Sequence, residues 1–75
     1  MTRPEATRLT AALSEASAEL LAYLQRRVAL DDAADLLGET MVVAGRRIAE
    51  LPENPVRARM WLSGIARGTM LSYAR

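Results

Sequence analysis

The chain has 75 residues and contains no cysteine, no histidine and no phenylalanine. Without cysteine it can build neither a disulfide framework nor a thiolate metal site, and without histidine it lacks the commonest proton shuttle and metal ligand. No apolar run approaches the roughly 20 residues that span a bilayer. The first residues, MTRPEATRLT, lack the apolar stretch of a secretory signal. The composition therefore predicts a cytoplasmic protein with no metal site and no cofactor.

Hydrophobic residues make up 51% of the chain, which is enough for a core. The length predicts one small domain over residues 1–75, and a domain of this size buries only about 60% of its unfolded surface, so it is marginal without a partner. The first 53 residues hold six arginines and nine acids, net −3, whereas the remainder holds four arginines and no acid, net +4. This basic segment also carries the single tryptophan, a combination that suits nucleic acid.

Apolar residues recur at intervals of three and four in three segments, which predicts helices over about 4–30, 32–51 and 55–73. Pro4 suits a first helical turn, and the pair Asp31-Asp32 predicts a stop followed by a new N-cap. The two prolines of Leu51-Pro52-Glu53-Asn54-Pro55 predict a rigid loop. No stretch alternates apolar and polar residues for long enough to indicate a strand. The predicted fold class is therefore all-α, a three-helix bundle.

Each predicted helix has one apolar stripe that should face the core. We expect Leu24, Leu37 and Ile65 to be buried, and Tyr73 to be a core residue with its hydroxyl outward. The full stripes are Leu9, Leu13, Ala16, Leu20, Leu24 and Val28; Leu36 or Leu37, Thr40, Val43 or Ala44, and Ile48; and Leu62, Ile65 or Ala66, Thr69 and Tyr73, with Met70 beside them.

Asp35 and Glu39 lie four residues apart, one helical turn, and therefore share a face. Paired carboxylates can do acid–base work, hold a hard metal ion, contact a protein or simply face solvent. No companion set for catalysis and no glycine-rich phosphate loop accompanies them. We therefore expect no enzyme, and either a solvated or a protein-contacting face.

The arginines of the last segment could form a binding surface. Arg57 and Arg67 are ten residues apart, close to three turns, and with Arg59 and Arg75 they predict a sparse basic stripe. The alternative is ordinary solvated arginine. Trp61 among them is either a core residue or a platform on which a base stacks.

From Leu20 to Arg75 the chain resembles region two of bacterial sigma factors of the extracytoplasmic-function group. The resemblance is carried by LLAYLQRRV from Leu20, by DAADLLGETMVVAGRRI from Asp32 and by ARMWLSGIARGTMLSYAR from Ala58. In the third segment, Trp61-Leu62 and Ile65-Ala66-Arg67 stand at the spacing of the family's Trp-Leu and Ile-Ala-Arg-Asn.

The resemblance implies a transcription initiation factor. The second helix would dock on the clamp helices of the largest subunit of core RNA polymerase. The loop and the third helix would recognise and melt the promoter −10 element and bind its single-stranded non-template strand. An anti-sigma factor is a further partner that the resemblance implies, and a helix-turn-helix domain would follow in a longer protein. The implied polymerase-binding residues are Asp35, Leu36, Glu39 and Thr40, and the implied DNA-binding residues are Asn54, Arg57, Arg59, Trp61 and Arg67.

The chain departs from the family pattern at Gly38, Met41, Gly45, Ala58 and Gly68, where the family favours glutamine, an aromatic residue, tryptophan, phenylalanine and asparagine. Gly68 removes a side chain that could bond DNA, so the departures bear on promoter melting more than on the clamp contact.

Two other interpretations compete with this one. A small helical protein-interaction module without DNA binding, whether or not it self-associates, would not need an acid-free segment from Val56 to Arg75. A third helix lying on a membrane surface is disfavoured because Arg59 and Trp61 are not on clearly opposed faces.

Overall fold

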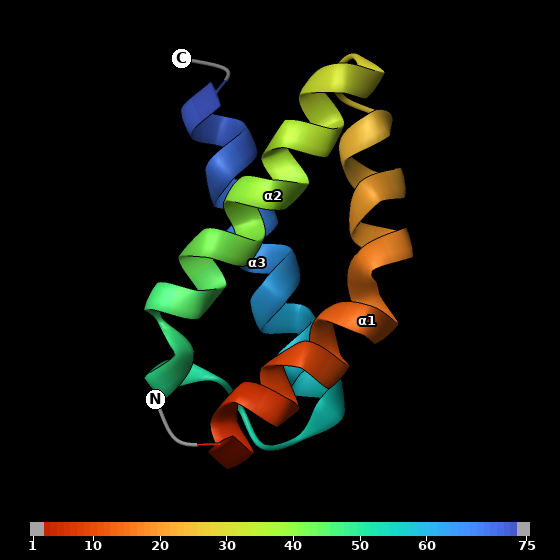
Figure 1. Ribbon diagram of the computed structural model, residues 1–75. Coiled ribbons are helices and arrows are strands. Elements are labelled where there is room, and N and C mark those ends of the chain that lie inside the picture. Colours follow the sequence, from red (N-terminus) through yellow and green to blue (C-terminus); the bar gives the residue numbers. More distant parts are fainter. Residues whose placement is uncertain (1–2, 74–75) are drawn as a thin grey trace.

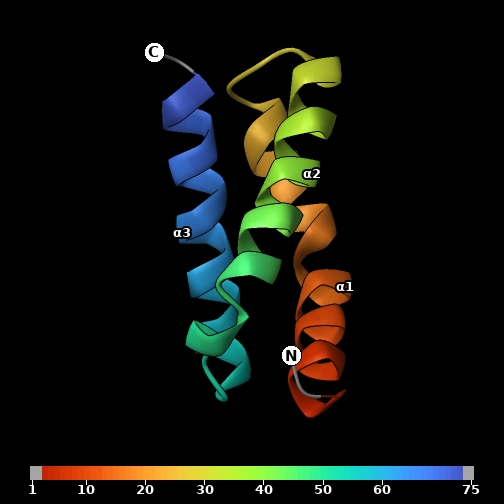
Figure 2. The ribbon, with the colours of Figure 1, turned by 60° about the vertical axis from the view of Figure 1, so that its left-hand side comes forward.

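The computed structural model describes residues 3–73, which form three α-helices and one short 3-10 helix. The helices are α1 (Arg3–Gln25), α2 (Leu30–Arg46) and α3 (Pro55–Tyr73), with η1 (Ile48–Glu50) between α2 and α3. Residues 3–73 contain no strand, which confirms the predicted all-α three-helix bundle. α1 and α3 run in one direction and α2 in the other, so the ends of α1 and α3 lie at the same end of the bundle as the start of α2 (Figures 1 and 2).

The connection between α1 and α2 differs from the prediction. α1 ends at Gln25, before the predicted end near residue 30, and the chain leaves it through a turn in which Val28 N donates to Leu24 O at 3.0 Å. α2 then begins at Leu30 with Ala29 as its N-cap, and no side chain caps it. The predicted aspartate N-cap is therefore wrong. Asp31 and Asp32 lie inside the first turn, where carboxylates favour the positive end of the helix dipole.

The predicted helix over 32–51 is divided into α2 and η1. α2 ends at Arg46, and the chain tightens into the 3-10 turn that precedes Pro52. The ring of Pro52 clashes with helical backbone at Leu51, so η1 ends at Glu50. Arg47 and Glu50 span η1 in a bidentate ion pair, with Nη2 to Oε1 at 2.8 Å and Nε to Oε2 at 3.1 Å.

The loop before α3 is fixed from both sides. Asn54 Oδ1 accepts the backbone N–H groups of Val56 at 2.9 Å and Arg57 at 3.1 Å, which makes Asn54 the cap of α3. Pro55 is the first helical residue, as predicted, and its missing N–H costs nothing there. Arg8 Nη1 donates to Pro52 O at 3.3 Å and ties the loop to α1.

The core lies between the three helices in two clusters, and half-buried Leu37 packs against both. The smaller cluster consists of Leu24, Ala33 and Leu36. The larger consists of Leu9, Ala16, Leu20, Ala44, Ile48, Leu51, Ala58, Leu62, Ile65 and Ala66.

Two of the three residues expected to be buried are buried, since Leu24 is 0% and Ile65 6% exposed. Leu37 was predicted wrongly: it is half-buried, and Leu36 takes the core position at 6% exposure. The buried stripe of α2 runs through Ala33, Leu36, Thr40 and Ala44, so the structure selects Leu36 and Ala44 from the alternatives that the periodicity left open. Tyr73 is also no core residue, because it is 51% exposed in the last turn of α3.

Candidate functional site

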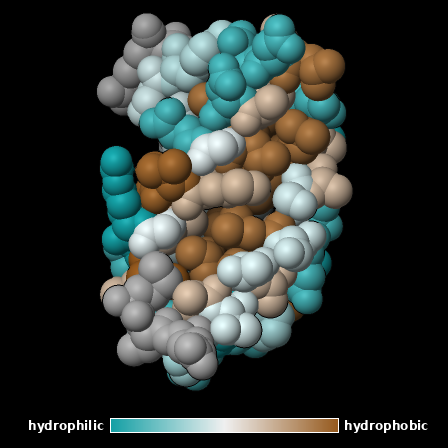
Figure 3. Space-filling view, viewed as in Figure 1, coloured by the Kyte–Doolittle hydropathy of each residue, from teal (hydrophilic) through white to brown (hydrophobic). Residues whose placement is uncertain are grey.

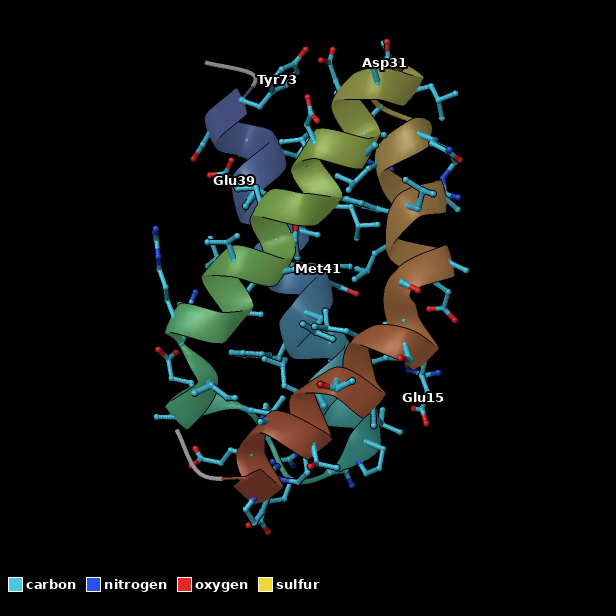
Figure 4. The ribbon with its side chains drawn as sticks, in the orientation of Figure 1. Glu15, Asp31, Glu39, Met41 and Tyr73 are labelled. Atoms are coloured by element: carbon cyan, nitrogen blue, oxygen red, sulfur yellow. The ribbon has the colours of Figure 1, made fainter. Side chains whose placement is uncertain are left out.

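One candidate surface is a hollow of about 340 Å³ between α2 and the end of α3, which we call the acidic hollow. Asp32, Asp35 and Glu39 line it from α2, where their spacing puts them on one face. Figure 4 shows Glu39 on the side of α2 that faces α3, and Tyr73 at the end of α3. Asp35 and Glu39 are both exposed, so their carboxylates can reach a partner. Its other lining residues are Leu36, Thr69, Ser72 and Tyr73.

Leu36 and Thr40 do not offer the surface that a polymerase contact needs. They are 6% and 0% exposed, and both belong to the inner face of α2. Thr40 Oγ1 lies 2.8 Å from Leu36 O and 3.2 Å from Thr69 Oγ1 of α3. Thr40 therefore faces α3 and Leu36 lies in the core with Leu24 of α1, so the exposed side chains on this part of α2 are Asp35 and Glu39.

Tyr73 closes the upper end of the acidic hollow. Its hydroxyl donates to Asp32 Oδ2 at 2.6 Å and links the last turn of α3 to the first turn of α2. The pKa of Tyr73 is raised, chiefly by this hydrogen bond, then by desolvation and by the nearby carboxylate charge. The bond requires the phenol to keep its proton.

Around the start of α3, acidic residues from other parts of the chain lie beside the arginines. Arg59 lines a hollow of about 170 Å³ together with Arg8, Glu15 and Glu53, so two carboxylates accompany two guanidinium groups. Arg57 is exposed and does not line this hollow. The side-chain oxygen of Asn54, a predicted DNA contact, is occupied by the helix cap.

Trp61 lies partly in the core. It is half-buried and packs against the larger cluster, and its indole N–H is buried without a hydrogen-bond partner among residues 3–73. A ring held in this way cannot present a full face to a base, so the core interpretation fits the geometry better.

The second candidate surface is a hollow of about 600 Å³ between the end of α1 and α3, which we call the basic hollow. It is lined by Tyr23, Arg27, Ser63, Gly64, Arg67, Met70 and Leu71. The guanidinium of Arg27 lies 3.9 Å from the centroid of the Tyr23 ring, and its Nη1 donates to Tyr23 O at 3.0 Å. Of the expected DNA contacts, only Arg67 lines this hollow. Arg57 lies ten residues before Arg67, and at 100° per residue this places it about 80° away around the axis of α3. Arg75 lies outside the described residues.

Sequence reasoning missed Tyr23, Arg27 and Ser63 as site residues. The four-residue spacing of Tyr23 and Arg27 on one helix was a usable signal, since such pairs face each other. Their approach to Arg67 depends on how α1 packs on α3, which no local pattern shows.

No model of a known protein family matches the chain, and neither a curated protein nor a solved structure matches it. Within residues 3–73, no group of three or more acidic side chains is placed to hold a metal ion, and no helix is long and apolar enough to cross a bilayer. The arrangement instead offers two binding surfaces of opposite charge on the two flanks of α3.

Proposed function

We propose that the chain is a DNA- and polymerase-binding domain of a transcription initiation factor, similar to region two of sigma factors. It acts by binding and carries out no catalysis of its own. The observation that carries the proposal is the exposed pair Asp35 and Glu39 on α2, beside a helix, α3, whose only charged residues are arginines. A bacterial polymerase works in the cytoplasm, so the proposal also implies a cytoplasmic protein.

The polymerase contact is assigned to the acidic hollow. Carboxylates one turn apart on a rigid helix complement basic residues on a helical partner such as the polymerase clamp helices. Such charge pairs fix orientation and speed association more than they add affinity. An anti-sigma factor that covered this hollow would block the polymerase, which gives the implied second protein partner a physical role.

The DNA contact is assigned to the exposed arginines of α3, Arg57, Arg59 and Arg67. Guanidinium groups bind phosphates and release counterions, so affinity should fall as salt rises. The loop from Leu51 to Asn54 joins α3 at its capped end and is the expected place for an unpaired base of the −10 element. Opening a duplex needs such a place, because the flipped base must lose its stacking partners.

The test is a pull-down of core RNA polymerase by the immobilised chain. Asp35→Arg with Glu39→Arg should abolish capture while circular dichroism stays unchanged, because both side chains are exposed. Glu15→Arg with Glu19→Arg is the matched control: it reverses an exposed pair, also four residues apart, on α1. Equal capture by parent and by the α2 variant would show that α2 is not the docking face.

A protein-interaction module without DNA binding is the second candidate function. It is favoured by exposed apolar side chains on α3. Val56 and Met60, which are four residues apart, are 55% and 67% exposed. On the other side of the bundle, Figure 3 shows apolar surface over the middle of the face that α1 and α2 share, where Met41 is 38% exposed. This candidate would be favoured if the chain binds no oligonucleotide at any salt concentration and self-associates as its concentration rises.

A further inference from the structure

The basic hollow adds a contact on α1 that the predicted DNA surface did not include. We propose that it binds one nucleotide unit of a single strand, with the phosphate between Arg27 and Arg67 and the sugar or base against Met70 and Leu71. This inference rests on the proposed DNA binding and extends it from α3 onto the end of α1, where the last turns of both helices lie at the same end of the bundle (Figure 2).

The charge of the hollow selects an anion. Two arginines line it, Arg27 from the turn that follows α1 and Arg67 from α3, and no acidic residue does. Among the described residues, neither Arg27 nor Arg67 forms an ion pair, so no carboxylate neutralises either guanidinium at short range. Guanidinium groups present several N–H donors in a planar fork that matches phosphate oxygens.

Arg27 is held in place before any ligand arrives. Its guanidinium stacks on Tyr23 at 3.9 Å, and one of its N–H groups is bonded to Tyr23 O at 3.0 Å, which leaves other donors of the fork for a phosphate. A side chain that is already ordered loses less conformational entropy on binding. The same stacking leaves the outer face of the guanidinium plane available to a base, as in single-strand binding sites.

The opposite wall suits the rest of a nucleotide. Leu71 is 48% exposed and Met70 half-buried, so they offer apolar surface beside the charges, and Ser63 adds an exposed hydroxyl. Gly64 contributes no side chain, and a Cβ placed there would meet nothing within 4 Å. A concave site with a charge on each side and an apolar wall fits one unit of a strand better than a flat bilayer surface.

Gly64→Glu is the sharpest test, because the new side chain enters open space and a helix prefers it to glycine. Binding is followed by fluorescence anisotropy of a labelled oligothymidylate about 16 nucleotides long, the upper end of the sites that small domains cover. We expect Gly64→Glu to melt no lower than the parent and to bind at least about tenfold more weakly, since it fills the hollow and adds a negative charge. Gly38→Glu is the matched control: it makes the same change at an equally open, exposed glycine on α2, and its affinity should stay within about twofold, because salt screens a remote charge.

Arg27→Ala tests the phosphate contact on its own. It should weaken binding by about threefold or more and flatten the salt dependence by about 0.7 in the logarithmic slope, the value for one phosphate of a single strand. Arg26→Ala is the control, since Arg26 is the exposed neighbour of Arg27 that does not line the hollow.

The outcomes separate this inference from the proposed function. If Arg57→Ala and Arg59→Ala weaken binding but Arg27→Ala and Gly64→Glu do not, the inference is wrong and DNA binding by α3 stands. If the parent chain binds no oligonucleotide, the inference and the DNA half of the proposed function both fail, while the polymerase pull-down still tests the other half. Binding to phosphatidylserine vesicles that Gly64→Glu abolishes, with no binding to oligothymidylate, would show a lipid-headgroup site and overturn the inference.

Discussion

At the scale of single residues, Asn54 has two candidate roles that substitution can separate. Asn54→Ala removes the acceptor for the N–H groups of Val56 and Arg57 and should cost about 0.5–2 kcal/mol, the usual loss for a helix cap. Asn54→Asp keeps an acceptor and suits the positive end of α3, so its melting temperature should match or exceed that of the parent.

The aspartate variant also tests the predicted DNA contact, because it retains the cap but adds negative charge. If Asn54 touches DNA, Asn54→Asp should lose affinity for an oligonucleotide while staying folded. An unchanged affinity in a folded Asn54→Asp chain would leave the residue with a structural role alone.

Several of these residue roles could not have been derived from the sequence. Leu36 and Leu37 are adjacent and equally apolar, so their periodicity left open which one faces the core, and packing against α1 decided for Leu36. For Thr40 the periodicity predicted a core position and the resemblance implied a partner contact; it is fully buried, as the periodicity predicted. The sequence left open whether Trp61 is a core residue or a platform on which a base stacks, because its burial depends on how α3 packs.

At the scale of helices, α2 and α3 meet through a pair of threonine hydroxyls. Thr40 Oγ1 and Thr69 Oγ1 are 3.2 Å apart, and each also lies 2.8 Å from a carbonyl of its own helix, Leu36 O or Ala66 O. Each hydroxyl has one proton, so at most two of these three contacts are hydrogen bonds at any one time.

Thr40→Val should therefore be tolerated. Valine fills the same volume, Leu36 O already accepts the helical N–H of residue 40, and Thr69 can donate to Ala66 O, so no buried group loses its only partner. We expect the free energy of unfolding to change by less than about 1 kcal/mol in chemical denaturation. A loss above about 2 kcal/mol would mean that the hydroxyl pair is a principal link between the helices, since isosteric removal of a satisfied bond is nearly neutral.

Helix number and the position of α3 were predictable because their signals are local. The two prolines of the 51–55 loop placed the start of α3 at Pro55, where the structure has it. The end of α1 and the start of α2 were not predictable to the residue. Asp31 and Asp32 favour both an N-cap and a first turn, and the apolar pattern through Val28 continues past the point where the helix unwinds.

At the scale of the whole molecule, the charges are arranged around α3. Asp32, Asp35 and Glu39 flank it on the α2 side, and Arg27 accompanies Arg67 on the α1 side. The sequence predicted a division between an acidic body and a basic final segment. The fold changes that division, because it brings Glu15 and Glu53 to Arg59, and it brings Arg27, in the turn after α1, to the far end of α3.

The stability of the whole chain should depend on pH only at the two extremes. Without histidine, no side chain has an ordinary pKa near neutrality. The pKa of Glu50 lies below its ordinary value of 4.5, first because Arg47 bonds it, so this contribution is present above that value and is lost as pH falls through the folded pKa. The pKa of Tyr73 is raised above 10.0, first by its bond to Asp32, so its contribution is complete below that value and is lost as pH rises through the folded pKa.

Thermal melts across pH should therefore show a plateau from about pH 5 to about pH 10, with a decline on each side. Glu50→Gln should lower the plateau and reduce the acid decline, because the group that titrates there is gone and its pairing with Arg47 is weakened. Tyr73→Phe should lower the plateau and reduce the alkaline decline, since phenylalanine can neither donate to Asp32 nor ionise. A titration that follows the ultraviolet signal of Tyr73 should show it ionising above the ordinary range, and Asp32→Ala should return it toward that range. If Tyr73 ionises at the ordinary value in the parent, the bond between α2 and α3 at this end of the bundle does not persist in solution.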